Sequence, residues 1–292
     1  MKFYQWLVIS TLFTFSFSPS QAQEFPLHIM EEGHIIVQVK VNENLTGNFI
    51  LDTGAGTHVV SGKFFEKIKE AAVQQGYFTG FRHDGDRLDG PIYQISSISI
   101  GEYQQTQPKV GVYPPLDDFG IDGLLSLKFF EDKPFVINFK EAKLTFLDQA
   151  AVEAISENAL TVPLQLYQHT DILLDIFIPI TINGQHKIWA EFDTGSGYGA
   201  FIIRPNYIKD WQLKESTRTT QVYTTQLTQE TREDQIFPLS TISLVEGDKI
   251  LQQDSVQAVF REGLIFNALV GSGLFKEKKI CIDISGKRFI VN

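Results

Sequence analysis

The chain has 292 residues, of which 43% are hydrophobic and 21% are charged, the composition of a globular protein with one or two domains. A formal net charge of −10 and the lack of a basic stripe argue against a nucleic-acid partner. Cys281 is the only cysteine, so no disulfide can form within the chain. Its alternating apolar surroundings predict a buried thiol and not a nucleophile.

The first 22 residues have the layout of a secretory signal peptide. Lys2 precedes an apolar run over residues 6–17, and the small residues Ser20 and Ala22 follow it. We therefore expect cleavage near Ala22 and an exported protein of bacterial type, periplasmic or secreted. A membrane anchor is the alternative, but the apolar run is short for a core of about 30 Å. After cleavage we expect no stable membrane insertion.

From residue 23 onward, alternation of apolar and polar residues predicts a mostly β protein with few short helices. Strands are expected at 34–41, 47–52, 93–100, 134–139, 143–147, 173–182, 187–193, 237–244, 278–284 and 288–292. Helical periodicity is limited to 62–73, 149–155 and 204–211.

The two halves of this pattern repeat. Residues 122–146 align without gaps on residues 267–291, and apolar positions coincide along the alignment. A repeat this long is a two-fold duplication and not a solenoid. It predicts two homologous β lobes, at 23–150 and 166–292, related by a pseudo-two-fold axis and joined by a connector at 151–165.

Residues 52–54 read Asp-Thr-Gly behind an apolar strand, and residues 193–195 repeat the tripeptide at the equivalent point. One copy could be a simple Asx-turn, but two related by a pseudo-dyad can bring their carboxyl groups together. Two adjacent carboxyl groups share a proton, so one acts as a base toward water while the other polarises a carbonyl. Asp52 and Asp193 are therefore the predicted catalytic pair for peptide hydrolysis, with no metal and no cofactor.

The apolar-apolar-Asp-Thr-Gly pattern, followed in the second half by Leu269-Val270-Gly271, resembles the aspartic proteases of the pepsin and retropepsin superfamily. The resemblance implies two acid-protease-like β-barrel lobes and an aspartic endopeptidase acting on a peptide or protein substrate. It also implies that one chain, carrying both tripeptides, suffices as a monomer. The residues that it implies as support for the catalytic pair are Thr53, Gly54, Thr194, Gly195 and Ser196.

Two residues depart from the family pattern. Ser126 stands where glycine is usual, and Glu191 occupies a usually apolar position two residues before Asp193. We expect the small serine to be tolerated, and strand alternation to turn Glu191 away from the core. These departures support the alternative of a catalytically inactive peptide-binding protein. Ser196 also offers a hydroxyl that Ala55 lacks, so Asp193 should ionise more readily while Asp52 holds the proton.

A substrate-covering hairpin is expected at 77–94, where His83, Asp84 and Gly85 form the turn signal. An exposed surface hairpin is the alternative. The stretch at 221–236 is the corresponding candidate in the second lobe.

Residues 195–200 fit a dinucleotide-binding fingerprint in outline, but the following residues continue as a strand, which argues against it. The histidines show no metal-ligand spacing, so no metal site is expected.

Overall fold

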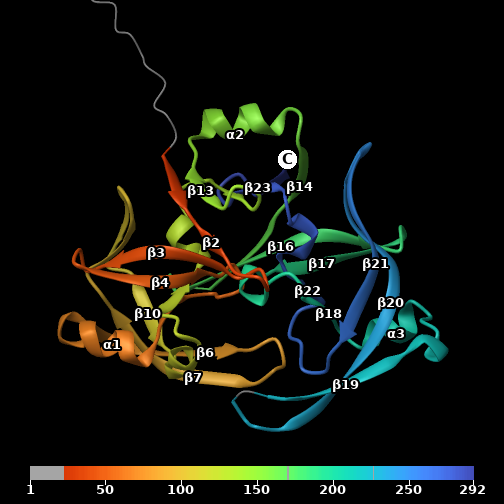
Figure 1. Ribbon diagram of the computed structural model, residues 1–292, viewed down its shortest axis with the longest axis horizontal. Coiled ribbons are helices and arrows are strands. Elements are labelled where there is room, and N and C mark those ends of the chain that lie inside the picture. The colour runs from red at the N-terminus through yellow and green to blue at the C-terminus, as the bar shows by residue number, and fades with distance from the viewer. Residues whose placement is uncertain (1–22, 170, 226) are drawn as a thin grey trace, which may run out of the picture.

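The computed structural model describes residues 23–169, 171–225 and 227–292 (Figure 1). The expected signal peptide at 1–22 lies outside the described residues. Among the residues that are described, no helix is both long and apolar enough to cross a membrane.

The first lobe contains short strands and short helices in the following order. The strands are β1 (Glu24–Pro26), β2 (His28–Ile29), β3 (Ile35–Val41), β4 (Leu45–Leu51), β5 (His58–Val60), β6 (Val73–Phe81), β7 (Arg87–Gln94), β8 (Ser97–Ile100), β9 (Tyr103–Thr106), β10 (Lys109–Val112), β11 (Gly123–Leu125), β12 (Phe135–Asn138) and β13 (Lys143–Phe146). The helices are α1 (Gly62–Ile68) and the 3₁₀ turns η1 (Lys69–Ala71), η2 (Pro114–Phe119) and η3 (Leu127–Phe130).

Helix α2 (Gln149–Ser156) then leads into the second lobe. The strands there are β14 (Leu160–Pro163), β15 (Gln165–His169), β16 (Leu173–Ile182), β17 (His186–Phe192), β18 (Phe201–Ile203), β19 (Thr219–Thr224), β20 (Thr231–Glu246), β21 (Lys249–Phe260), β22 (Ala268–Val270), β23 (Lys279–Asp283) and β24 (Arg288–Val291). The helices are α3 (Asn206–Asp210) and the 3₁₀ turns η4 (Thr194–Ser196), η5 (Glu215–Thr217) and η6 (Ser272–Phe275).

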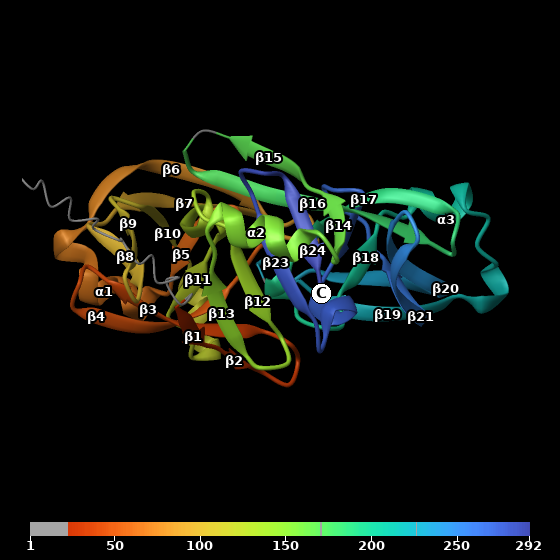
Figure 2. The ribbon, with the colours of Figure 1, turned by 90° about the horizontal axis from the view of Figure 1, so that it is seen from above.

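The described strands form three sheets. One ten-stranded sheet belongs to the first lobe, and an eight-stranded sheet belongs to the second. The third has the order β1-β13-β12-β23-β24-β14 and therefore takes strands from both halves of the chain. Seen from above, β12, β13, β23 and β24 lie between the two lobes (Figure 2). The mostly β, two-lobed architecture predicted from the sequence is confirmed.

The pseudo-two-fold axis passes through this shared sheet. β12 and β23 pair antiparallel, with Val136 directly opposite Cys281. These two residues are also equivalent in the sequence repeat, so the axis runs between them. Cys281 is buried, as predicted, and burial raises the pKa of its thiol to about 12.

An equivalent phenylalanine lies in each core, although its aromatic partners differ. Phe130 stacks on Phe135 at 4.0 Å in the first lobe, and its equivalent Phe275 packs edge-on against Phe192 at 5.2 Å in the second. Phe192 is fully buried and directly precedes Asp193. Close packing of such aromatic side chains holds the end of β17 in a fixed position.

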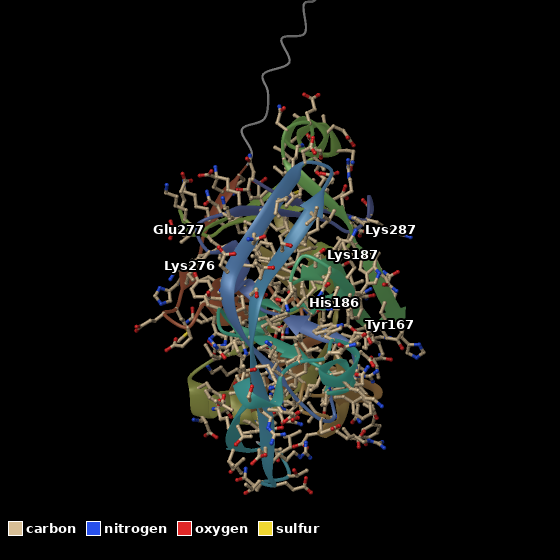
Figure 3. All side chains as sticks on the ribbon, turned by 90° about the vertical axis from the view of Figure 1, so that its right-hand side faces the viewer. Tyr167, His186, Lys187, Lys276, Glu277 and Lys287 are labelled. Carbon is tan, nitrogen blue, oxygen red and sulfur yellow. The ribbon has the colours of Figure 1, made fainter. Side chains whose placement is uncertain are left out.

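Some sequence expectations fail locally. The strand expected at 93–100 is two strands, because β7 ends at Gln94 and β8 begins at Ser97. The helix expected at 62–73 ends at Ile68 and continues as a 3₁₀ turn. The 12-residue strand β21 was not predicted, since its polar centre at 252–254 hides the alternation. Figure 3 shows the long β20–β21 hairpin across the end of the second lobe, with Lys276 on one side and His186 on the other.

Candidate active site

Asp52 and Asp193 stand at corresponding strand ends. Asp52 follows β4, and its backbone N–H donates to the carbonyl of Leu125 at 3.0 Å. Asp193 follows β17, and its N–H donates to the carbonyl of Val270 at 2.9 Å. In each lobe the supporting strand, β11 or β22, runs parallel to the strand that carries the aspartate. Both carboxyl groups are therefore positioned by the sheet and not by a free loop.

Thr53 and Thr194 join the lobes beneath the aspartates. The Thr53 hydroxyl donates to the carbonyl of Phe192 at 2.6 Å, and the Thr194 hydroxyl donates to that of Leu51 at 2.7 Å. Each hydroxyl also accepts the backbone N–H of the other threonine, at 3.0 and 3.1 Å. Both threonines are completely buried. The cross-lobe hydrogen bonds implied by the resemblance are thus present, and they fix the two tripeptides relative to each other.

Gly54 and Gly195 let the two carboxyl groups approach. A Cβ added to Gly54 would overlap the carboxyl group of Asp193, and one added to Gly195 would overlap that of Asp52. Each carboxylate therefore lies against the glycine of the opposite tripeptide. Asp52 Oδ1 accepts the N–H groups of Gly54 and Ala55, both at 3.0 Å, while Asp193 Oδ1 accepts the N–H of Gly195 at 2.8 Å.

The electrostatics of the pair are asymmetric. Burial, followed by the negative charge of Asp193, raises the pKa of Asp52 well above its usual range. The Ser196 hydroxyl donates to Asp193 Oδ2 at 2.5 Å, and Ala55 can offer Asp52 no such bond. A hydrogen bond of this kind favours the ionised carboxylate. This arrangement agrees with the expectation that Asp52 carries the shared proton.

Ser126 leaves the supporting turn intact. Its hydroxyl accepts the backbone N–H of Lys128 at 3.1 Å and so caps η3. Its own N–H donates to Nδ1 of His58 at 3.2 Å, and His58 Nε2 lies 2.9 Å from Gln105 Oε1. Burial lowers the pKa of His58 to about 4, so the imidazole is neutral. His58 was missed because its partners are distant in sequence.

At the position of Ser126 and its counterpart Gly271, glycine is required only in the second lobe. Gly271 is the counterpart of Ser126, and its N–H donates to the carbonyl of Ala200 at 2.8 Å. A Cβ at this position would overlap the carbonyl oxygen of Gly197. In the first lobe the His58 side chain accepts the corresponding N–H. The expectation that serine is tolerated at 126 therefore agrees with the packing.

Alternation turns Glu191 away from the apolar core, as expected, since its strand neighbours Ala190 and Phe192 are the residues that join that core. The side chain is nevertheless buried, and only 5% of the residue is exposed. The reason is that residues two apart on a strand share a face, which puts Glu191 on the side of Asp193. Asp175, on the neighbouring strand β16, is equally buried. Burial and then the charge of Asp193 raise the pKa of Asp175 to about 7 and that of Glu191 well above its usual range.

The hairpin β6–β7 reaches across the lobe junction. Its turn is closed by the N–H of Gly85 donating to the carbonyl of Arg82 at 2.9 Å, and Gly85 has a φ of +83°. His83, in the same turn, lies within electrostatic range of Asp193. Burial, followed by the charges of Arg261 and Arg82, lowers the pKa of His83.

The tip of this hairpin is bonded to the hairpin β19–β20 of the other lobe (Figure 1). Arg232 Nη2 lies 2.7 Å from Asp86 Oδ1, and the N–H of Thr228 donates to Asp86 Oδ2 at 3.3 Å. Asp84 and Asp86 are both buried, so the alternative of an exposed surface hairpin is wrong at the tip. The two candidate stretches, one from each lobe, meet each other.

The other sequence motifs form no site. The fingerprint-like glycines at 195–200 are followed by strand β18 and not by a helix. Throughout the described part of the chain, no three His, Cys, Asp or Glu side chains are grouped so that they could hold a metal ion.

Comparisons with known proteins agree with this geometry. Residues 37–129 match the family of aspartyl proteases. No curated protein matches the chain in sequence. Among solved structures, the crystal structure of Basic 7S globulin from soybean is similar with a TM-score of 0.56 at 9% identity, over 94% of this chain and 97% of that one. Residues 37–129 thus match an aspartyl protease domain, and the chain as a whole has a pepsin-like two-lobed fold.

Proposed function

We propose that the protein is an aspartic endopeptidase in which Asp52 and Asp193 form the catalytic dyad. The observation that carries this proposal is the pair of carboxyl groups, each lying against the opposite glycine at the lobe junction. The cross-lobe threonine bonds and the raised pKa of Asp52 support it further. A rigid carboxyl pair that shares one proton is the machinery that acid–base hydrolysis needs.

In the proposed mechanism Asp193 is the base and Asp52 is the acid. Ionised Asp193, held by Ser196 and Gly195, takes a proton from a water molecule while that water attacks the peptide carbonyl carbon. Protonated Asp52 transfers its proton to the carbonyl oxygen, which gives a tetrahedral diol. The amide nitrogen then receives the proton from Asp193, the C–N bond breaks, and the diol loses its proton to Asp52. The starting protonation state is thereby restored.

The substrate of this reaction would be an extended peptide that binds between the dyad and the two hairpins. The hairpin tips are joined by Asp86, Arg232 and Thr228, so entry requires these contacts to open. Opening of a covering segment before the reaction is common among enzymes that exclude water. We therefore assign the β6–β7 hairpin, with His83, Asp84 and Gly85, the role of a substrate-covering flap.

The test is cleavage of a peptide library by the purified protein between pH 3 and pH 7. Asp52→Asn and Asp193→Asn are assayed beside it, since each keeps the shape of the side chain and removes its acid–base function. We expect the unmodified chain to cleave and each variant to lose at least about a thousandfold in kcat/KM. Cleavage that survives either substitution would contradict the dyad.

A peptide-binding protein without catalysis is the second candidate. One solved structure that is similar to this chain bears the name of a globulin, and the hairpins here are joined to each other. A folded protein that binds library peptides but cleaves none at any pH would favour this candidate.

Export also stays a prediction, and N-terminal sequencing of the protein recovered from its native host would test cleavage near Ala22.

A further inference from the structure

Two carboxyl groups beside the dyad have no part in the mechanism above. Asp175 and Glu191 are each only 5% exposed. Among the described residues, neither side chain accepts a hydrogen bond or forms an ion pair. Carboxyl groups that are this deeply buried are normally paired, because an unpaired buried charge is costly. Their position therefore calls for an explanation in terms of a partner from outside the chain.

Strand register places both groups on the face that carries Asp193. Glu191 lies on β17 directly opposite Phe177 of β16, and Asp175 comes two residues before Phe177. Asp193 comes two residues after Glu191. Since side chains two apart on a strand point to the same side, Asp175, Glu191 and Asp193 share one face of the β16–β17 pair.

This acidic face reaches the first lobe. The N–H of Leu174 donates to the carbonyl of Gly56 at 3.0 Å. Asp175 Oδ1 lies 3.1 Å from the point that a Cβ on Gly56 would occupy. Gly56 is part of the turn that follows Asp52. The carboxyl group of Asp175 thus lies at the junction between the lobes, next to the turn that carries the dyad.

The charges that act on these two groups all have the same sign. Asp193, Asp175 and Asp52 act on Glu191, and Asp193 acts on Asp175. No lysine, arginine or histidine of the described residues lowers the pKa of either group. A cation bound here would relieve this repulsion and favour the ionised form of both groups, in a poorly hydrated place where such interactions are strong.

The equivalent place in the first lobe is not acidic. The repeat makes Ile50 the counterpart of Glu191 and His34 the counterpart of Asp175. His34 Cε1 lies 3.7 Å from the Cβ position of Gly197, just as Asp175 lies against Gly56. The two sides of the dyad therefore share a geometry but differ in charge, so a preference for a cation should concern one side of the scissile bond only.

We propose that Asp175 and Glu191 form a subsite for the positively charged side chain of a lysine or arginine in the substrate, next to the scissile bond on the side of the second lobe. This inference rests on the proposed function for the identity of the ligand as a peptide. A lysine ammonium has three donors and an arginine guanidinium has five, enough to bond both carboxylates at once. A metal ion fits less well, because the described residues group no third ligand there.

The test uses pairs of peptides that are identical except for lysine or norleucine at the first position on either side of the cleaved bond. Norleucine keeps the alkyl chain and lacks the charge. The unmodified protein is compared with Glu191→Gln and Asp175→Asn, which retain the shape of each side chain. Glu102→Gln, at an exposed turn, is the matched control. The same peptides are also titrated against Asp52→Asn and against Asp52→Asn combined with Glu191→Gln.

We expect the unmodified protein to prefer lysine over norleucine by about tenfold or more in kcat/KM, on one side of the bond only. Glu191→Gln and Asp175→Asn should each reduce this ratio, and Glu102→Gln should not. If the lysine and norleucine peptides are cleaved with equal efficiency, and Glu191→Gln does not change their ratio, the subsite is contradicted while the proposed hydrolysis is supported. The other outcome is that the protein cleaves nothing, while Asp52→Asn binds the lysine peptide more tightly than the norleucine peptide and Glu191→Gln removes this difference. That result would contradict the proposed hydrolysis and support the subsite.

Discussion

Asp175 should make the protein less stable as the pH rises, and Asp175→Asn should remove the effect. The pKa of this carboxyl is raised from 3.8 to about 7, by burial and then by the charge of Asp193. A difference of about 3 pKa units corresponds to roughly 4 kcal/mol. Below pH 4 the group is protonated in both folded and unfolded chains and has no effect. Between pH 4 and pH 7 the unfolded chain ionises first, so the free energy of unfolding falls.

The measurement is urea unfolding followed by tryptophan fluorescence at pH 4, 6 and 8. Asp175→Asn should match the unmodified protein at pH 4 and exceed its free energy of unfolding by up to roughly 4 kcal/mol at pH 8. Asp118→Asn, at an exposed residue, is the control and should leave the free energy of unfolding unchanged at all three pH values. A difference that is the same at all three pH values, or absent at pH 8, would show that the Asp175 carboxylate is hydrated or paired and would refute the reasoning.

Substitutions at three further positions test other parts of the site. Thr194→Val removes cross-lobe hydrogen bonds and should lower the free energy of unfolding by about 2 kcal/mol, whereas Thr194→Ser should restore most of it; urea unfolding measures both. Ser196→Ala removes a hydrogen bond that favours ionised Asp193, so the acid limb of the pH–rate profile should move to higher pH; an unmoved limb would contradict the assignment of the base. Asp86→Asn weakens the contact with Arg232, so hydrogen exchange at both hairpin tips should accelerate, and equal exchange would mean that other contacts hold them.

The sequence was sufficient to bring Asp52 and Asp193 together because the relevant signal is local and duplicated. An aspartate at the end of an apolar strand, with threonine and glycine behind it, needs no knowledge of distant residues to be noticed. The duplication then predicts the long-range relation that the site needs, because it relates the strand ends at Asp52 and Asp193 by a pseudo-two-fold axis. The cross-lobe bonds of Thr53 and Thr194 follow from the same relation.

What the sequence did not reveal depends on register between strands. That Asp175 shares a face with Glu191 follows only once Phe177 is known to lie opposite Glu191. Alternation by itself tells which residues share a face, but not whether the face opposite the apolar core is covered, and this is why the burial of Glu191 was not foreseen. The contact of Asp86 with Arg232 joins two hairpin tips, where no periodic pattern predicts a partner.

The duplication explains why two aspartates meet, but two identical lobes would give no reason for one aspartate to be the acid and the other the base. If both lobes were identical, the shared proton would lie equally on either aspartate, and a peptide could bind in either direction. Ser196, Glu191 and Asp175 all belong to the second lobe, and their first-lobe counterparts carry no carboxyl or hydroxyl group. The hydroxyl favours ionised Asp193, while burial and the charge of Asp193 favour a protonated Asp52. The acidic subsite would then fix the direction of the substrate on the same side of the dyad that holds the base. Asp175→His combined with Glu191→Ile gives the second lobe the residues that the first lobe has at these positions. This double substitution should therefore remove the one-sided preference for lysine while cleavage continues.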